Sequence, residues 1–379
     1  MGRRATGGEA VGRSGGSLPR VVIDDFRSGG IRRGLREDFR ELYRFYFDED
    51  ERERLARMRS LRRWLRIAWH LLRALILRLS PVRRILLLVS LFLTINGAVD
   101  FSVGEVRVRF TLMPLAYALV LLVLLLELKD KLLARDEIEV ARQVQLALLP
   151  REQPRLAGWS LWCSTRPAND VGGDLVDHVA LAGGSLGIVL GDVAGKGLGA
   201  ALLSAKLQAS LRAVLPECRS LADLGARLNA ILHRDGIENR FATLFYAEII
   251  PESGRLRVLN AGHNPALLFR RGGTQRIGAS APPLGMFGNT TYREEVLDLE
   301  PGDLVVAFSD GLTEARNARD EEFGEARIEG LASGLRGRPA TEVGERIVGG
   351  AEAFLGERRP HDDLSVFVLA RSGAEGRSP

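Results

Sequence analysis

Aspartates at the ends of short apolar segments are the residues of this chain best suited to chemistry. They occupy four places: Asp174 and Asp177 in Val-Gly-Gly-Asp-Leu-Val-Asp, Asp192 in Gly-Asp-Val-Ala-Gly-Lys-Gly, Asp310 in Ser-Asp-Gly, and Asp362 with Asp363 in His-Asp-Asp-Leu-Ser. Any one of them, taken alone, is better explained as a turn or cap residue. Several such carboxylates converging at a sheet edge would make an all-oxygen site suited to Mg²⁺ or Mn²⁺.

Two such cations about 4 Å apart can bridge a water, lower its pKa and direct it at phosphorus. This chemistry needs no cysteine or histidine nucleophile, which suits a chain with 2 Cys and 5 scattered His. Cys163 and Cys218 are too few for a disulfide framework or a cysteine-built zinc site. We expect Cys163 to be a core residue of an apolar strand, and His263 to order a turn.

The sequence matches three other phosphate-binding or nucleotide-binding motifs only in part. The run Gly195–Ala200 satisfies the loose Gly-x-Gly-x-x-Ala dinucleotide pattern, but a loop and a helix follow where a second strand with a terminal acid is required. A phosphate-binding loop needs Ser or Thr where Gly197 stands. The Gly-Gly-Asp of residues 172–174 is followed by Leu-Val rather than the Glu-Phe of cyclic-dinucleotide synthases.

The elements that must position the aspartates are short strands and helices in mixed order. The strand-like runs are Ser185–Leu190, Thr243–Ile250, Leu256–Leu259, Leu304–Phe308 and Leu364–Leu369, and the helix-like runs are Leu198–Val214, Leu221–His233 and Thr341–Leu355. Many strands come in pairs joined by turns, without regular alternation of strand and helix. This pattern predicts an α+β fold with antiparallel sheets.

Charge is distributed unevenly along the 379 residues. The hydrophobic fraction of 46% is ordinary for a folded chain and excludes wholesale disorder. Residues 1–84 carry 21 Arg, no Lys and 11 acidic residues, whereas the rest is net acidic. The basic character therefore belongs to an N-terminal arm, and we expect no nucleic-acid partner for the protein as a whole.

The arm changes character along its length. Residues 1–53 read as a basic, flexible arm. Residues 54–84 contain ten arginines, no acidic residue, and interleaved Leu and Trp. This composition favours an amphipathic helix at a membrane interface, with Arg on anionic headgroups. A basic helix that contacts RNA or DNA is the alternative.

Two uncharged apolar runs follow, Ile85–Val99 and Phe110–Leu126, joined by a short polar loop. Each lies near the lower limit of the roughly 17–25 residues that span a bilayer. We expect residues 85–126 to form a two-helix transmembrane hairpin, and two buried core helices are the alternative. The arginines before the first run predict an N-terminus and a C-terminal domain in the cytoplasm, on the inner face of a two-pass membrane protein.

The connector, residues 127–150, is densely charged and helical up to Pro150. Its stripe of Ala134, Ile138, Ala141 and Leu148, interrupted by Gln145, suits a short coiled coil between two copies of the chain. A single amphipathic helix packed on its own domain is equally consistent. Residues 151–371 would form the domain that carries the aspartates, followed by a tail over 372–379.

From about Ile138 to Ala370 the chain resembles the bacterial PPM-type metal-dependent serine/threonine phosphatases, in the branch with the sporulation stage II E and sigma-factor regulator phosphatases. Eight strings match in family order: residues 141–150, 171–177, 191–197, 241–246, 260–265, 283–285, 309–315 and 362–365. The resemblance does not cover residues 1–126. It implies a two-layer antiparallel β-sandwich flanked by helices, with two Mn²⁺ or Mg²⁺ ions at one edge.

The resemblance also implies a ligand set: Asp192 bridging both ions, the backbone carbonyl of Val193, Asp310, one of Asp362 and Asp363 with Asp362 favoured, and Asp174 as a ligand or nearby acid. Asp192 and Asp310 are thereby the candidate catalytic residues. The arginine that contacts phosphate in some members of the superfamily has no clear counterpart here.

The resemblance finally implies a function. A membrane-anchored phosphatase would hydrolyse phosphoserine or phosphothreonine, with a phosphorylated anti-sigma-factor antagonist as substrate in a partner-switching pathway. The connector is similar to a dimerising linker that moves helices beside the metal site. A catalytically silent scaffold and a metal-dependent nucleotidyl cyclase are the alternatives, which phosphatase and cyclase assays separate.

Overall fold

A computed structural model describes residues 55, 58, 60–103, 106–150, 153–235, 240–251 and 253–372, without the side chains of 99–110. The predicted arm over 1–53 and the tail beyond 372 lie outside the described residues. The chain divides into two compact units at Asp130 and Lys131, within helix α6 (Met113–Leu148). Each unit is described by itself.

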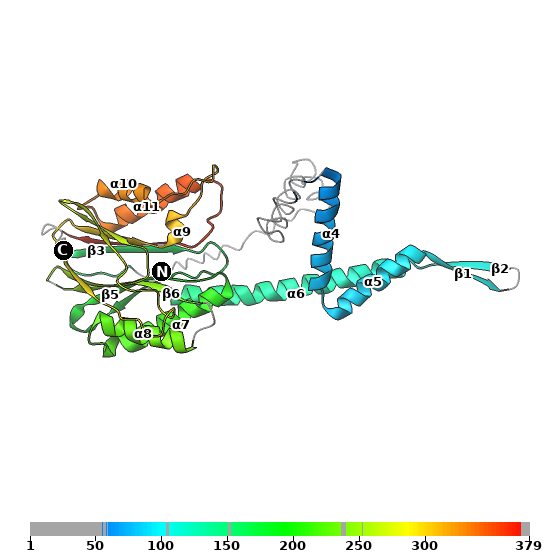
Figure 1. The fold of residues 1–379 in the computed structure, drawn as a ribbon, viewed down its shortest axis with the longest axis horizontal. Helices are drawn as coiled ribbons and strands as arrows, with labels where there is room; N and C mark the ends of the chain where they lie inside the picture. Colours follow the sequence, from blue (N-terminus) through cyan, green and yellow to red (C-terminus); the bar gives the residue numbers. More distant parts are fainter. Residues whose placement is uncertain are drawn as a thin grey trace, which may run out of the picture. The chain divides into compact units, whose positions relative to one another are not determined.

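The second unit contains two five-stranded antiparallel sheets (Figure 1). The first has the order β10-β7-β6-β5-β4, with β4 (Leu175–Ala180), β5 (Leu186–Val193), β6 (Ala242–Ile250), β7 (Arg255–Ala261) and β10 (Glu295–Asp298). The second has the order β3-β12-β11-β8-β9, with β3 (Trp159–Arg166), β8 (Ala266–Arg270), β9 (Gly273–Ile277), β11 (Leu304–Phe308) and β12 (Leu364–Arg371). The sheets stack face to face.

Helices cover the outer face of each sheet (Figure 1). The first sheet carries α7 (Leu198–Val214), η2 (Leu215–Glu217) and α8 (Leu221–Asp235), and the second carries α9 (Asp310–Thr313), α10 (Glu325–Ser333) and α11 (Ala340–Leu355); a short turn, η1 (Ala182–Gly184), joins β4 to β5. The covering helices are amphipathic. In α8, for example, Leu221, Leu224, Leu228 and Leu232 recur at helical spacing and are buried against the first sheet.

Three apolar cores result from this layering. One lies between the sheets, where Ile188, Phe245 and Phe367 are buried together. The other two lie between each sheet and its helices. Strands buried on both faces explain why β11, Leu-Val-Val-Ala-Phe, is a continuous apolar run with every residue buried. The α+β sandwich flanked by helices, predicted from the sequence, is confirmed.

Most predicted elements of this unit are present with small changes in their ends. The structure reproduces Leu198–Val214 and Leu304–Phe308 as predicted. Strand β5 runs further than predicted, so that Asp192 lies inside the strand rather than after it. Asp310 begins α9 instead of ending the preceding strand.

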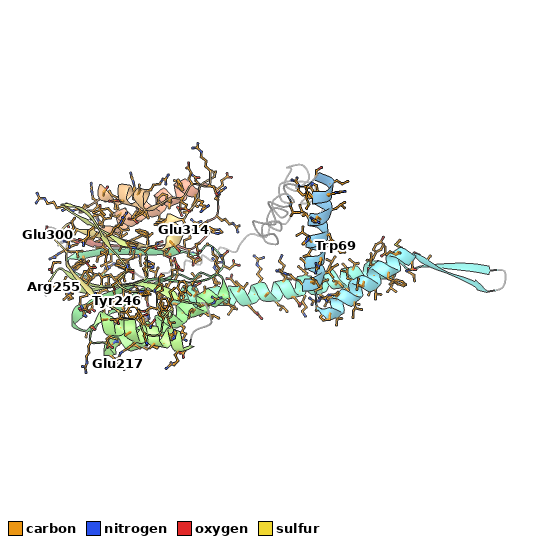
Figure 2. The ribbon with its side chains drawn as sticks, viewed as in Figure 1. Trp69, Glu217, Tyr246, Arg255, Glu300 and Glu314 are labelled. Carbon is orange, nitrogen blue, oxygen red and sulfur yellow. The ribbon has the colours of Figure 1, made fainter. Side chains whose placement is uncertain are left out.

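In the first unit, the basic segment is not one helix over 54–84. Helix α4 (Ser60–Arg78) ends before Ser80, and α5 (Pro81–Asn96) starts with proline in its first turn. Proline suits the start of a helix because its missing N–H is not needed there. Large apolar side chains of α4 are exposed, including Trp69, which is labelled in Figure 2.

The predicted transmembrane hairpin also requires correction. Gly97, at φ +63, ends α5, and the antiparallel strands β1 (Ala98–Val103) and β2 (Val106–Thr111) replace the ends of both predicted spans. Helix α5 has 16 residues, about 24 Å at 1.5 Å per residue, against a hydrocarbon core of about 30 Å. Helix α6 continues from the second apolar run into the charged connector without a break.

One described helical segment, Leu198–Glu217, has the length and apolarity to cross a membrane. It is formed by α7 and η2, which pack in the core of the second unit. The structure therefore does not establish either predicted span.

Candidate active site

The structure brings the predicted acidic residues to one edge of the sandwich, from four segments. Asp174 directly precedes β4, Asp192 is near the end of β5, Asp310 follows β11, and the pair Asp362–Asp363 precedes β12. The first sheet thus contributes two of the segments and the second sheet the other two. Asp174 and Asp363 are buried, and the other three are partly exposed.

Strand register explains the convergence. In the β4–β5 pair, Leu175 faces Gly191, which places Asp174 opposite Asp192 at adjacent strand ends. In the second sheet, the N–H of Ser309 donates to the carbonyl of Ser365 at 3.0 Å. This bond sets Asp310 beside the start of β12.

Three glycines allow the segments to approach each other. A Cβ on Gly172 would overlap the carboxylate of Asp363, and a Cβ on Gly311 would overlap the carbonyl of Asp363. A Cβ on Gly173 would lie 3.1 Å from the carbonyl oxygen of Val193, the predicted backbone ligand. The Gly-Gly of residues 172–173 is therefore needed for close packing beside the acids.

Asp363 is held by backbone groups. Its Oδ1 accepts the N–H of Ala168 at 2.8 Å, and its Oδ2 accepts the N–H of Asp174 at 3.2 Å. The hydroxyl of Ser309 donates to its carbonyl oxygen at 2.9 Å. Asp363 thereby links both sheets at the site and orders the segment that presents Asp174.

Asp362 is the more accessible member of the pair. Its Oδ2 lies 2.8 Å from Nζ of Lys196, which also donates to the carbonyl of His361 at 2.8 Å. Within the described part of the chain, this is the only ion pair that involves any of the five acids at this edge.

Asp174, Asp192 and Asp310 lie close enough to repel one another, and the positive charge of Lys196 offsets this only in part, at Asp310. Burial, followed by the charge of Asp192, raises the pKa of Asp174 well above its usual range. Burial, followed by Asp310 and then Asp362, raises the pKa of Asp192 to about 6. The pKa of Asp310 is raised by burial and by Asp362. The Oδ2 atom of Asp174 is buried and has no hydrogen-bond partner.

Such an arrangement favours a bound cation, because a divalent ion would relieve both the repulsion and the unsatisfied oxygen. Among the residues that the structure describes, no three Asp, Glu, His or Cys side chains are already arranged to hold one ion. The donor chemistry fits a hard cation, since every candidate atom is a carboxylate or carbonyl oxygen.

Asp177, from the same sequence motif as Asp174, does not belong to this edge. Arg212 donates to both of its oxygens at 2.7 Å, and Gln208 donates to Oδ2 at 2.9 Å. The same Gln208 amide donates to the carbonyl of Leu148 at 2.9 Å. Asp177 therefore connects β4 to α7, and Gln208 connects α7 to the end of α6.

Gln145 is a residue whose role the sequence reasoning missed. Its amide donates to the carbonyl of Gly172 at 2.7 Å and accepts the N–H of Gly172 at 3.0 Å. These two bonds fasten α6 to the segment that carries Asp174. The only sequence signal was the polar residue in an otherwise apolar helical stripe.

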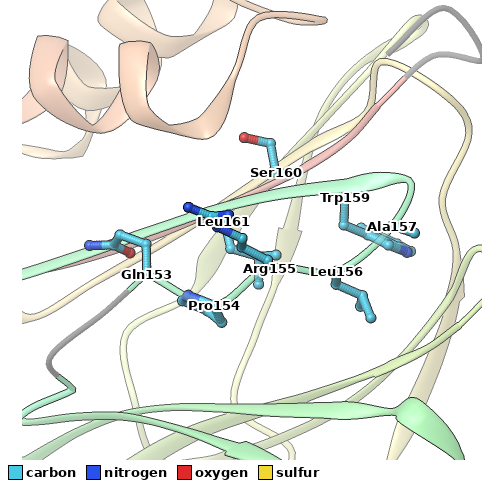
Figure 3. A pocket seen from close by; sticks show the side chains of 8 residues that line it. All are labelled: Gln153, Pro154, Arg155, Leu156, Ala157, Trp159, Ser160 and Leu161. Carbon is cyan, nitrogen blue, oxygen red and sulfur yellow. The ribbon is translucent and has the colours of Figure 1, made fainter. Parts of the chain in front are cut away.

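Two pockets differ in their relation to the acids. A cavity of about 240 Å³ lies between the end of α6 and the acidic edge, with Arg142, Arg166, Asp174 and Asp363 in its wall. A larger pocket, about 740 Å³, is lined by residues 153–157 and 159–161 (Figure 3). No acidic residue lines it.

The larger pocket is remote from the acids. It contains Trp159, which faces Arg371 at the far end of β12, whereas Asp363 precedes Leu364 at the near end. Eight residues of strand separate the ends, about 25 Å. We therefore place the functional site at the acidic edge.

Cys163 and His263, the other residues singled out in the sequence, pack inside the domain and support its structure. Cys163 lies in β3 next to the core between the sheets, as predicted, and burial raises the pKa of its thiol to about 11. His263 is buried in the turn after β7, where Nδ1 lies 2.8 Å from the hydroxyl of Thr243.

Comparison with known proteins was consistent with the fold and the motifs. Residues 182–372, just over half of the chain, match the model of the family described as Stage II sporulation protein E (SpoIIE). Protein IcfG of Synechocystis sp. is 32% identical over 275 residues, which are 65% of this chain and 43% of that protein. Phosphoserine phosphatase RsbU of Bacillus subtilis is 26% identical over 241 residues, covering 62% of this chain and 70% of RsbU.

The chain thus spans less than half the length of IcfG. Among solved structures, the SiaA-PP2C domain of Pseudomonas aeruginosa superposes with a TM-score of 0.56 at 20% identity, covering 64% of this chain and 99% of that domain. At this identity the likeness shows the fold. Together with the family match over residues 182–372, it confirms the resemblance found in the motifs: the chain belongs to the stage II sporulation protein E family and carries a PP2C-type phosphatase domain.

Proposed function

We propose that this chain is a metal-dependent protein phosphatase that hydrolyses phosphoserine or phosphothreonine with a metal-activated water. The observation that supports this most is the edge where Asp174, Asp192 and Asp310 lie together and, among the described residues, none of the three forms an ion pair. Carboxylates alone repel a phosphate ester, so the edge suits phosphoryl chemistry only when cations are bound.

We assign the cations as two Mn²⁺ or Mg²⁺ ions, held by Asp192, the carbonyl of Val193, Asp310 and Asp362, with Asp174 as a further ligand or nearby acid. Bound there, they would lower the pKa of a water and neutralise charge on the phosphoryl group. The chain's own residues set the geometry. Asp363 is buried and holds two backbone N–H groups, whereas Asp362 is partly exposed and acts electrostatically on both Asp192 and Asp310, which favours Asp362 as the ligand of the pair.

Lys196 and Asp363 act as positioning residues in this account. Lys196 holds the Asp362 carboxylate at the edge from the loop before α7. Asp363 keeps the main chain of Asp174 within reach of Asp192. Hydrolysis would consume one water and release the free hydroxyl side chain and inorganic phosphate.

The proposed substrate is a phosphorylated anti-sigma-factor antagonist in a partner-switching pathway. Support comes from similarity to RsbU, a protein named as a phosphoserine phosphatase. The test uses the intact chain with a phosphoserine peptide and with an aryl phosphate, with and without Mn²⁺. We expect turnover that needs Mn²⁺ and is lost in Asp192→Asn.

The same assay addresses the two alternatives. A silent scaffold would bind Mn²⁺ or a partner but release no phosphate from either substrate. A nucleotidyl cyclase would convert a nucleoside triphosphate to a cyclic product and leave the phosphoserine peptide intact. Either result would overturn the proposed activity.

We further propose that the first unit attaches the phosphatase domain to the inner face of the cytoplasmic membrane. Its helices expose many apolar side chains, and a polar side chain lies buried between α5 and α6. Ser90 is buried and donates to the carbonyl of Ala116 at 2.9 Å, while large apolar side chains of α5 and α6 are exposed: Ile85, Leu88, Leu91, Phe92, Ile95, Leu115, Leu121, Leu122, Leu124 and Leu125. Lipid tails would cover such a surface.

Charged residues mark one end of this helical pair. Arg83 of α5 lies 2.7 Å from Glu127 and 2.5 Å from Asp130 of α6. The arginines of α4 would contact anionic headgroups. In flotation with vesicles of mixed neutral and anionic lipid, the intact chain should rise with the lipid, and Phe92→Asp with Leu121→Asp should weaken this. Flotation unchanged by both substitutions would count against the proposal.

A homodimer through α6 is the last part of the proposal. Of the predicted stripe, Ile138 and Ala141 are partly buried in the chain's own second unit. Exposed Leu133, Val140 and Val144, at spacings of seven and four, offer an alternative seam for a second copy. Val140→Glu should shift the intact chain in detergent from dimer to monomer by sedimentation; a wild-type monomer would contradict the proposal.

A further inference from the structure

Arg240 lies just before β6, and its guanidinium rests on two glycines that follow Asp192: Gly195 in the loop and Gly199 in the first turn of α7. A Cβ on Gly199 would be 2.9 Å from Nη2 of Arg240, and a Cβ on Gly195 would be 3.1 Å from Nη1. Side chains at either position would push the guanidinium away. Gly195 and Gly199 therefore leave the space that the Arg240 guanidinium occupies.

The guanidinium has no counter-charge in the described part of the chain. Its Nη1 is buried and makes no hydrogen bond. Other arginines of the same sheet and its helices are paired, as Arg212 is with Asp177 and Arg257 with Glu248 and Glu294. A buried guanidinium N–H without an acceptor is costly, and an anion supplied by a ligand would satisfy it.

The group lies beside the acidic edge rather than on it. Ala200, next to Gly199, has its Cβ 3.4 Å from the position of a Cβ on Gly173, and that position is 3.6 Å from Oδ1 of Asp192. The N–H of Ala194 donates to the carbonyl of Phe241 at 2.9 Å, which ties the chain next to Arg240 to the loop after Asp192. Arg240 thus contacts the segment that follows Asp192 and forms no ion pair with the acids.

We propose that Arg240 is the residue that binds the phosphoryl group of the substrate at this site, an inference that rests on the proposed phosphatase function. A guanidinium presents paired N–H donors that match phosphate oxygens, which an ammonium does not. It would therefore determine the preference for a dianionic phosphate ester and hold inorganic phosphate as the product.

The test measures phosphate in two ways in the intact chain with Mn²⁺. One is the dissociation constant for inorganic phosphate, which needs no turnover. The other is KM and kcat for an aryl phosphate and for a phosphoserine peptide. In Arg240→Ala we expect phosphate binding to weaken and KM for both substrates to rise by about tenfold or more, with a smaller change in kcat.

Three further variants make the result specific. Arg240→Lys should recover part of the phosphate affinity, and Gly199→Ala, which displaces the guanidinium, should weaken it even if Arg240→Ala does not fold. Arg346→Ala, at an exposed position on α11, is the matched control and should match the wild type.

Unchanged phosphate affinity in Arg240→Ala and Gly199→Ala would overturn the proposal. A rise in KM for the peptide alone would also overturn it, because Arg240 would then contact the peptide rather than the phosphate. If the wild type binds phosphate but hydrolyses nothing, the proposed function fails while the phosphate titration still reports on Arg240.

Discussion

Asp174 and Asp177 are three residues apart, both buried, and differently surrounded. Asp177 has a guanidinium on both oxygens and an amide on one. Asp174 has a buried Oδ2 without a hydrogen-bond partner, and the negative charge of Asp192 adds to burial in raising its pKa. The same residue type at the same depth is thus fully compensated in one place and uncompensated in the other.

The difference separates a structural acid from a candidate ligand. Burying a paired carboxylate orders the elements that it joins, here β4 and α7. Burying an unpaired one beside other acids is unfavourable unless a cation is bound. Removing each acid in turn should therefore give opposite results.

The largest expected effect is on turnover. Asp192→Asn and Asp310→Asn should each lower Mn²⁺-dependent hydrolysis by on the order of 10³-fold, because each removes a ligand to ions that stabilise the transition state. Initial rates with an aryl phosphate measure this, with thermal unfolding as the check on folding. Either variant with wild-type rates would remove that residue from the ligand set.

His263 is a buried base that, like Asp174, is buried without a compensating charge in the described part of the chain. Burial lowers its pKa to about 4, below the 6.5 of the unfolded chain. Protonation therefore favours the unfolded state, and the free energy of unfolding should fall by about 3 kcal/mol as pH drops from about 6.5 to about 4. Urea unfolding across this range should show the slope in the wild type and a shallower one in His263→Gln. Equal slopes in the wild type and in His263→Gln would contradict this role of His263.

Substitution of Asp177 and of Asp174 should give the next largest effect, on the free energy of unfolding. Asp177→Asn should reduce the free energy of unfolding by roughly 1–3 kcal/mol, because it weakens charge-assisted hydrogen bonds to Arg212. Asp174→Asn should leave the metal-free chain equally or more stable, since it removes an unpaired buried charge. Urea unfolding in the presence of a chelator compares them. Destabilisation of equal size in both variants would contradict the assignment of Asp177 as a structural acid and Asp174 as a candidate ligand.

The smallest expected effect concerns the contact from α6. Gln145→Ala removes both hydrogen bonds to Gly172 and should weaken Mn²⁺ binding about tenfold, as loss of supporting contacts commonly does. Gln143→Ala, exposed on the same helix, is the control. If both variants bind Mn²⁺ like the wild type, α6 does not influence the site.

The pattern of apolar residues was sufficient to predict many strands and helices of the phosphatase domain. Strand β11 could be delimited because Asp303 and Ser309 flank its apolar run, and helix α7 because Gly197 precedes it and Pro216 follows shortly after its end. The same rule failed in the first unit. Ala98 and Val99 continue an apolar run, yet Gly97 ends the helix and turns them into a strand. Apolar composition alone does not distinguish these two outcomes.

At the site, residue types indicated which acids matter but not how each is used. Four segments with aspartates predicted a shared edge, and strand register brings them there. The separate role of Asp177 depends on Arg212, 35 residues later, a pairing without local sequence signal. Gln145 and Arg240 act through contacts with glycine backbone, which leave no pattern in the residue types.

The most direct test of this account is a calorimetric titration of the intact, chelator-treated chain with Mn²⁺ at pH 7. We predict saturable binding in the wild type and in Asp177→Asn, and loss of that binding in Asp192→Asn. Binding in Asp192→Asn that equals the wild type, or no binding in the wild type, would contradict the claim that the unpaired carboxylates form a cation site.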